Sequence, residues 1–194
     1  MASRTRERLI DVARQLFARK GIENTTMNDI ATASDRGRRT IYTYFRTKSE
    51  IYQAVIEDES ARIIKELIAK VDNQTTPGNK LRALMEYRIA IASDNASGYD
   101  VWLKSLFSRD AKRANSVRAM TTGRIYAMID EIIAAGIASG DFDPIQARRL
   151  PAMLSMILRS NDLTMMHETT RDSAPQWRAQ CIDFIIDAVE NKKS

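Results

Sequence analysis

The chain has 194 residues, of which 44% are hydrophobic, and a formal net charge of +5 at pH 7. This length and apolar content are sufficient for a buried core in one domain or in two small ones. The single cysteine, Cys181, excludes an intramolecular disulfide, and no apolar run approaches the roughly 20 residues that span a bilayer, so we expect a cytoplasmic protein with no membrane partner.

The positive charge is concentrated near the N-terminus. Residues 1–50 hold eleven Lys and Arg against six Asp and Glu, whereas residues 51–194 hold nineteen of each. An excess confined to one segment is typical of a protein that attracts phosphate groups there. A membrane surface would attract this charge as well, but the segment lacks the broad apolar face of an interfacial helix.

Helical periodicity dominates the chain. Only four prolines and seven glycines occur, and apolar residues recur at helical spacing, so we predict an all-α fold of about nine helices. The first helix is expected over residues 4–20 and is stopped by Gly21. Its apolar stripe consists of Leu9, Ile10, Ala13, Leu16 and Phe17.

Residues 26–51 begin with a second, short helix. Thr26 and Asp29 have the spacing of a capping box, in which the threonine hydroxyl and the acid satisfy two unpaired backbone amides. The helix is expected to end near Ser34 and Asp35, because these side chains compete with the helix for their own backbone.

A third helix is expected over residues 38–45. Gly37 is expected to permit the sharp turn that precedes it. Ile41 and Phe45 lie four residues apart and therefore share the face that turns inward. The remaining faces of this helix are basic and rich in hydroxyl groups.

Two short helices joined by a tight turn are typical of a helix-turn-helix, whose second helix enters the major groove of DNA. Arginine can bind guanine through two hydrogen bonds, and hydroxyl groups and lysine can bind phosphates. The alternative is a solvated basic hairpin without a partner. The candidate DNA-binding residues are Thr26, Arg36, Gly37, Arg38, Arg39, Thr40, Tyr42, Thr43, Tyr44 and Lys48. Arg4, Arg6 and Arg8 of the first helix are either available to a phosphate or merely solvated.

This segment resembles the N-terminal domain of the TetR-family (tetracycline-repressor-like) transcriptional regulators. The resemblance covers about the first quarter of the chain and follows a string of residues with characteristic spacing: Ile30, Ala31, Thr40, Ile41, Tyr42, Tyr44, Phe45, Lys48, Glu50 and Ile51. Where the family usually has Ala-Gly-Val-Ser before the recognition helix, this chain has Ser34, Asp35, Arg36 and Gly37. Glycine thus replaces the usual serine N-cap, at little cost, and Arg36 replaces a small turn residue.

A long helix is expected over residues 47–72, although Asp58 and Glu59 interrupt its apolar stripe. We expect residues 1–46 to form the helix-turn-helix domain and residues 47–194 a helical regulatory and dimerisation domain, with the long helix connecting the two. This helix either acts as a lever or simply joins two rigid halves.

Further helices are predicted in the C-terminal part from periodicity and from the Pro and Gly residues between them. One of them contains Pro151, which removes a backbone hydrogen bond, so a kink is expected between Arg148 and Pro151. The expected ranges are residues 77–93, 117–138, 144–167 and 174–191.

The last two helices are more apolar than a single layer requires, which predicts that they pair with their copies in a homodimer. A two-fold DNA-binding protein needs such a dimer, because one short recognition helix reads few bases, and TetR-like regulators pair in this way. The alternative is a monomer with both helices internal. The candidate interface residues are Leu150, Leu154, Ile157, Leu158, Trp177, Cys181, Phe184, Ile185 and Ala188.

The resemblance also implies a pocket for a small-molecule effector among the middle helices. Methionine suits irregular cavities, but a methionine or aromatic stripe at helical spacing is more often plain core, and this alternative stays open. The candidate ligand-binding residues are Tyr87, Trp102, Phe107, Met120, Arg124, Met128 and Met156.

No H-E-x-x-H, G-x-S-x-G or G-x-x-x-x-G-K-[ST] string occurs, so we expect neither an enzyme nor a metal or cofactor site. The sequence predicts a dimeric, ligand-responsive transcriptional regulator, a repressor that a small molecule releases from a pseudo-palindromic operator. Two rivals are an architectural DNA-binding protein without a ligand and a helical enzyme.

Overall fold

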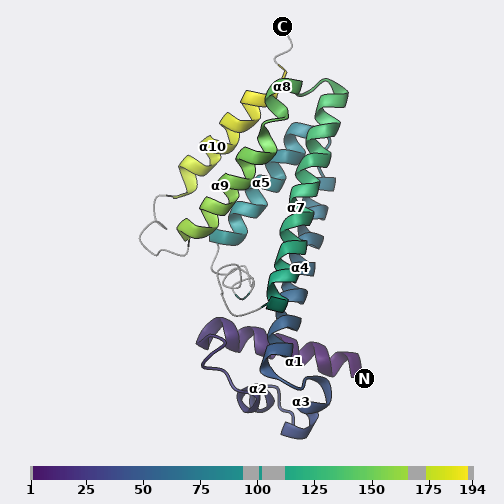
Figure 1. Ribbon diagram of the computed structural model, residues 1–194, viewed down its shortest axis with the longest axis vertical. Helices are drawn as coiled ribbons and strands as arrows, with labels where there is room; N and C mark the ends of the chain where they lie inside the picture. Colours follow the sequence, from purple (N-terminus) through teal and green to yellow (C-terminus); the bar gives the residue numbers. More distant parts are fainter. Residues whose placement is uncertain (1, 94–100, 102–111, 166–173, 192–194) are drawn as a thin grey trace. The chain divides into compact units, whose positions relative to one another are not determined.

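The computed structural model describes residues 2–93, 101, 112–165 and 174–191. All named elements in these ranges are α-helices, which confirms the predicted fold class, and an isolated β-bridge joins Phe142 and Glu190. The helices, shown in Figure 1, are α1 (Ala2–Lys20), α2 (Met27–Ala33), α3 (Arg38–Tyr44), α4 (Lys48–Asp72), α5 (Pro77–Ser93), α7 (Lys112–Ser139), α8 (Pro144–Ala147), α9 (Leu150–Met165) and α10 (Ala174–Val189).

The chain forms two compact units. The first contains the residues up to Arg62 and the described residues between 98 and 120. The second contains the described residues between 63 and 97 and those from Thr121 onward. The division therefore falls inside α4. A functional boundary between residues 46 and 47 stays a prediction.

In the first unit, α1, α2 and α3 pack around one apolar core (Figure 1). The stripe predicted for α1 is buried throughout, and it meets Ile30 of α2, Ile41 of α3 and Phe45. Burial of a large apolar side chain contributes roughly 1.5–3 kcal/mol, so this core fixes how the two short helices are held. Gly21, at φ +79°, ends α1 as predicted.

The turn between α2 and α3 differs from the expectation in one respect. Gly37 has an ordinary φ of −63°, whereas Asp35 adopts the left-handed conformation at φ +55°. Aspartate is among the few non-glycine residues that visit this region readily, because its short side chain can bond locally. Glycine is therefore not required for the sharp turn, whereas Gly37 is the N-cap of α3, as expected from the sequence.

An ionic cluster explains why acidic residues interrupt the stripe of α4. The guanidinium of Arg14 in α1 bonds the carboxylates of Asp58 and, at 2.7 Å, Asp11. The fully buried Glu59 lies 3.6 Å from Nε of Arg14. Removing one partner of the pair between Arg14 and the buried Glu59 is costly. Asp58 and Glu59 therefore attach α1 to the first part of α4.

The second unit is built on contacts of α5 with α9 and α10, which lie side by side in Figure 1. Leu81, Leu84 and Met85 of α5 are fully buried, and Leu154 of α9 and Ile185 of α10 are buried with them in the core of this unit. The apolar stripes of these helices thus face one another, as helical periodicity requires.

The predicted kink near Pro151 is a complete break. Helix α8 ends at Ala147, the chain turns at Arg148 and Arg149, and α9 starts at Leu150. Pro151 is the second residue of α9, where the missing N–H costs no helical hydrogen bond. Asp143 caps α8, since its Oδ1 accepts hydrogen bonds from two backbone amides.

Candidate nucleic-acid interface

The first helix of the candidate interface, α2, is fixed by the predicted capping box. The Oγ1 atom of Thr26 accepts a hydrogen bond from the backbone N of Asp29 at 3.1 Å, and Oδ2 of Asp29 accepts one from the backbone N of Thr26 at 2.9 Å. The backbone bond to Thr26 and the bond to its side chain lower the pKa of Asp29, because they stabilise the ionised carboxylate. The box is therefore complete at neutral pH.

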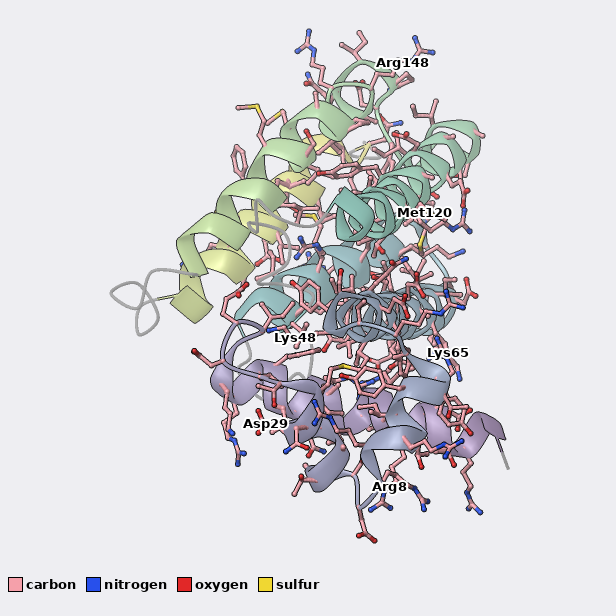
Figure 2. All side chains as sticks on the ribbon, turned by 60° about the horizontal axis from the view of Figure 1, so that its bottom comes forward. Arg8, Asp29, Lys48, Lys65, Met120 and Arg148 are labelled. Carbon is pink, nitrogen blue, oxygen red and sulfur yellow. The ribbon has the colours of Figure 1, made fainter. Side chains whose placement is uncertain are left out.

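The turn that leads into α3 is held by backbone and side-chain bonds. The N–H of Arg36 donates to the carbonyl of Ala31 at 3.0 Å. Nε of Arg8, from α1, donates to the carbonyl of Ser34 at 3.1 Å, and Figure 2 labels this arginine. The Arg8 bond satisfies a carbonyl at the end of α2, and together the two bonds fix the start of α3.

Helix α3 buries one face and exposes the other. Ile41 is fully buried, whereas Arg38, Arg39 and Thr43 are exposed and Tyr42 is 44% exposed. The guanidinium groups of Arg38 and Arg39 make no hydrogen bond or ion pair to any residue that the structure describes. Two arginines and a phenol thus remain available on one short helix, as a base-reading helix requires.

The other candidates of α3 are less available. Thr40 and Tyr44 are half-buried, and Oγ1 of Thr43 donates to the carbonyl of Arg39 at 3.1 Å. The hydroxyl of Thr43 can still accept a hydrogen bond. Their contact with DNA stays a prediction.

Lys48, at the start of α4, has partners inside the protein that the sequence did not suggest. Its Nζ donates to the carbonyl of Ile22 at 2.7 Å and lies 3.3 Å from that of Glu23 (Figure 2). An ammonium group has three donors, so one remains for a phosphate. Lys48 therefore ties the chain after α1 to the start of α4, whatever it does with DNA.

The predicted ligand-binding residues divide between the interior and the surface. Tyr87 and Met128 are buried, and the Tyr87 hydroxyl donates to Glu66 at 2.8 Å. Met120 and Met156 are 74% and 73% exposed, so they line no enclosed cavity in the single chain. Arg124 is exposed and lies 3.4 Å from Glu131. Trp102 and Phe107 lie outside the described residues.

The predicted dimer residues also separate into two sets. Leu150, Leu154, Leu158 and Ile185 are buried, and Ile157 is half-buried. The buried residues pack within the chain, and their contact with a partner stays a prediction. The side chain of Trp177 is outside the described residues.

The exposed set consists of apolar residues on α9 and α10, which lie side by side in Figure 1. It includes Phe184, which is 72% exposed, and Cys181 and Ala188, all three of which the sequence predicted. Met153 and Met156 are also exposed on α9; the sequence pattern gave Met153 no role, and a ligand-binding role for Met156 stays a prediction. We call Met153, Met156, Cys181, Phe184 and Ala188 the α9–α10 surface.

Other kinds of site receive no support among the described residues. No group of three or more His, Cys, Asp and Glu side chains there is arranged to hold a metal ion. None of the described helices combines the length and the apolar content needed to cross a membrane.

Comparison with known proteins bears on the candidate interface directly. Residues 9–55 match the sequence model of the bacterial regulatory proteins of the tetR family. An uncharacterized HTH-type transcriptional regulator of Mycobacterium tuberculosis is 27% identical over 186 residues, which are 94% of this chain and 84% of that protein. The HTH-type transcriptional regulator AcrR of Shigella flexneri is 28% identical over 103 residues, and the match covers 44% of this chain and 48% of that protein.

Solved structures share the fold over nearly the whole chain. A protein of Saccharomonospora viridis, named as a transcriptional regulator and crystallised in complex with choline, has a TM-score of 0.81 at 21% identity and covers 98% of this chain and all of its own. A transcriptional regulator of the TetR/AcrR family from Thermobifida fusca has a TM-score of 0.73 at 22% identity, over 94% of this chain and 96% of its own.

Proposed function

Since the chain belongs to the TetR family of DNA-binding transcriptional regulators, we propose that it is a homodimeric repressor that a small molecule releases from a pseudo-palindromic operator. In this proposal residues 1–46 read DNA, residues 47–194 bind the effector and the second copy, and the helix over residues 47–72 connects the two. The protein acts in the cytoplasm and needs no metal or cofactor.

The observation that carries the proposal is the exposed face of α3. Arg38 and Arg39 leave their guanidinium groups without partners among the described residues, while Ile41 anchors the same helix in the core. An arginine can bind O6 and N7 of guanine at once. The helix is therefore both fixed in place and free to read base edges.

The α9–α10 surface supports the dimer. The exposed methionine and phenylalanine side chains lie on two neighbouring helices, where a partner could cover them together. Pairing each helix with its copy would cover them in a four-helix bundle. A dimer with two-fold symmetry matches two half-sites of a palindromic operator.

The effector proposal rests on the second unit and on family resemblance. Tyr87 and Met128 are buried candidates there, and the Saccharomonospora viridis protein of the same fold carries choline. The effector favours one arrangement of the paired DNA-reading helices and DNA favours another, so each weakens the binding of the other. A coupling of about 1–3 kcal/mol would change DNA affinity roughly 5- to 150-fold.

The test begins with duplexes selected by this protein from a random library. Thermal melting with a panel of metabolites and drugs then identifies compounds that stabilise the native chain. A compound that raises the melting temperature should also lower affinity for the selected duplex. If DNA binds and no compound both shifts the melt and releases it, the protein is an architectural DNA-binding protein instead.

A further inference from the structure

A basic cleft lies on the first unit beside the recognition helix. It has a volume of about 600 Å³ and is lined by Arg4, Thr5, Glu7, Arg8 and Asp11 of α1 and by Arg36 of the turn before α3. We infer that Arg4 and Arg36 form a clamp for a DNA backbone phosphate, separate from the base-reading face of α3. The inference rests on the proposed DNA-binding function.

The structure separates the arginines that the sequence left equivalent. The guanidinium of Arg6 lies 5.3 Å from the centroid of the Phe45 ring and stacks on it. Nε of Arg8 is occupied by the carbonyl of Ser34. The guanidinium groups of Arg4 and Arg36, in contrast, make no hydrogen bond or ion pair with any described residue. Two uncommitted guanidinium groups therefore share the cleft.

The acidic residues of the cleft do not cancel this charge. Three arginines of the lining outnumber its two acids, which leaves a net charge of +1, and the Asp11 carboxylate already accepts a hydrogen bond from Arg14 at 2.7 Å. The positive side chains of the lining are Arg4, Arg8 and Arg36. A guanidinium group presents its donors in a planar fork that fits two oxygens of one phosphate.

The position of Arg36 is set by the backbone and not by its side chain. Its N–H bonds Ala31, the preceding Asp35 takes the left-handed conformation, and Arg8 holds the neighbouring carbonyl. Gly37, the next residue, is the N-cap of α3. Because Arg36 is joined this rigidly to the start of the recognition helix, a phosphate bound in the cleft belongs to the duplex that α3 reads.

The test compares the salt dependence of DNA binding. Two duplexes are used, one selected by the protein from a random library and one unrelated, with dissociation constants measured between 50 and 200 mM NaCl. Loss of one phosphate contact lowers the slope of log affinity against log salt by about 0.9. Arg36→Ala is expected to lower the slope by about 0.9 on both duplexes. The ratio of wild-type to variant affinity should therefore shrink about 3-fold between 50 and 200 mM NaCl.

Arg4→Ala should behave in the same way, while the ratio of selected to unrelated affinity stays that of the wild type. Lys65→Ala is the matched control, since Lys65 is exposed, carries the same charge and lies in the second unit (Figure 2). It should leave the slope unchanged. Circular dichroism melting should be unaffected in all three variants, because each side chain is exposed.

Three outcomes overturn the clamp. If the wild type binds DNA and Arg36→Ala and Arg4→Ala keep its slope, the clamp is absent and the recognition helix stands. If sodium phosphate raises the melting temperature at constant ionic strength, the arginine variants abolish this rise and the slopes are unchanged, the cleft is a site for a free anion. If the wild type binds neither duplex at low salt, the DNA-binding proposal itself fails and the clamp falls with it.

Discussion

The face that α3 exposes and the α9–α10 surface differ in chemistry although both lie opposite a buried stripe. Helix α3 buries Ile41 and exposes two arginines and a tyrosine, whereas α9 buries Leu154 and exposes methionines. A charged exposed face fits a polyanion, and an apolar one fits a second copy of the same face. The two surfaces therefore divide the proposed work: one contacts DNA and the other brings two such contacts together.

Disruption of the α9–α10 surface is expected to have the largest effect. Phe184→Glu should convert a dimer into a monomer, because a charge cannot be buried unpaired between two helices. A central aromatic residue of an interface contributes about 2 kcal/mol or more, so the dimer dissociation constant should rise by about 30-fold or more. Analytical ultracentrifugation over a concentration series measures this change.

Met120→Glu is the matched control for Phe184→Glu. Met120 is as exposed as Phe184 and apolar, but it lies on α7 and belongs to the first unit, whereas α9 and α10 belong to the second. Its substitution should leave the association unchanged. Equal effects of both variants would show that the dimer does not use the α9–α10 surface.

The second prediction concerns the face of α3. Arg38→Ala or Arg39→Ala should relax specificity, at about 1–3 kcal/mol for an arginine that binds a guanine. The measurement is the ratio of affinities for a selected duplex and an unrelated one. Equal losses on the two duplexes for both variants would refute base reading by α3.

The two faces were not equally predictable from sequence. On α3 the charged residues can only face solvent, so Ile41 and Phe45 identify the inward side and the candidate DNA residues follow. On α9 and α10 apolar residues occupy both sides, and periodicity alone cannot say which side faces the chain's own core. The sequence therefore named Leu154 and Leu158 as interface candidates, although they are buried within the chain, and gave no such role to Met153, which is exposed.

Local capping signals predicted where a helix begins, whereas contacts between residues far apart in the sequence could not be predicted. Spacing alone predicted the Thr26 and Asp29 capping box. The bonds of Lys48 to carbonyls 25 and 26 residues away, and of Arg14 to Asp58, depend on how the helices pack. No periodicity encodes such contacts, so the sequence showed only that Asp58 and Glu59 were out of pattern.

The third prediction separates two roles of Lys48. Lys48→Ala should lower the free energy of unfolding by on the order of 1 kcal/mol, because two carbonyls lose a charged donor. It should also weaken binding equally on all duplexes and lower the salt slope by about 0.9 if its third donor holds a phosphate. Lower stability with an unchanged slope would restrict Lys48 to holding the chain after α1 against α4.

The smallest expected effect is a pH dependence of the stability of α2. Since the capping bonds depress the pKa of Asp29, the unfolded chain protonates this group first as the pH falls. The contribution of the box is thus fully present above the ordinary aspartate pKa of about 4 and is lost as the pH falls through the lower folded value.

Hydrogen-exchange protection of the first turn of α2, measured between pH 5 and pH 3, detects this loss. Asp29→Asn should flatten the dependence, because the amide does not titrate. Glu23→Gln, at an exposed position in the preceding segment, should retain it. Retention of the wild-type dependence in Asp29→Asn would show that another group causes it.

The central claim is that two copies of the chain, joined through the α9–α10 surface, each present α3 to the duplex. Hydroxyl-radical footprinting on a selected duplex, with the number of bound chains measured by sedimentation, tests it most directly. We predict two chains per duplex and two symmetric protected half-sites about 34–36 Å apart, or a multiple of that distance. A single protected patch from one bound chain, with equal affinity for unrelated DNA, would contradict it.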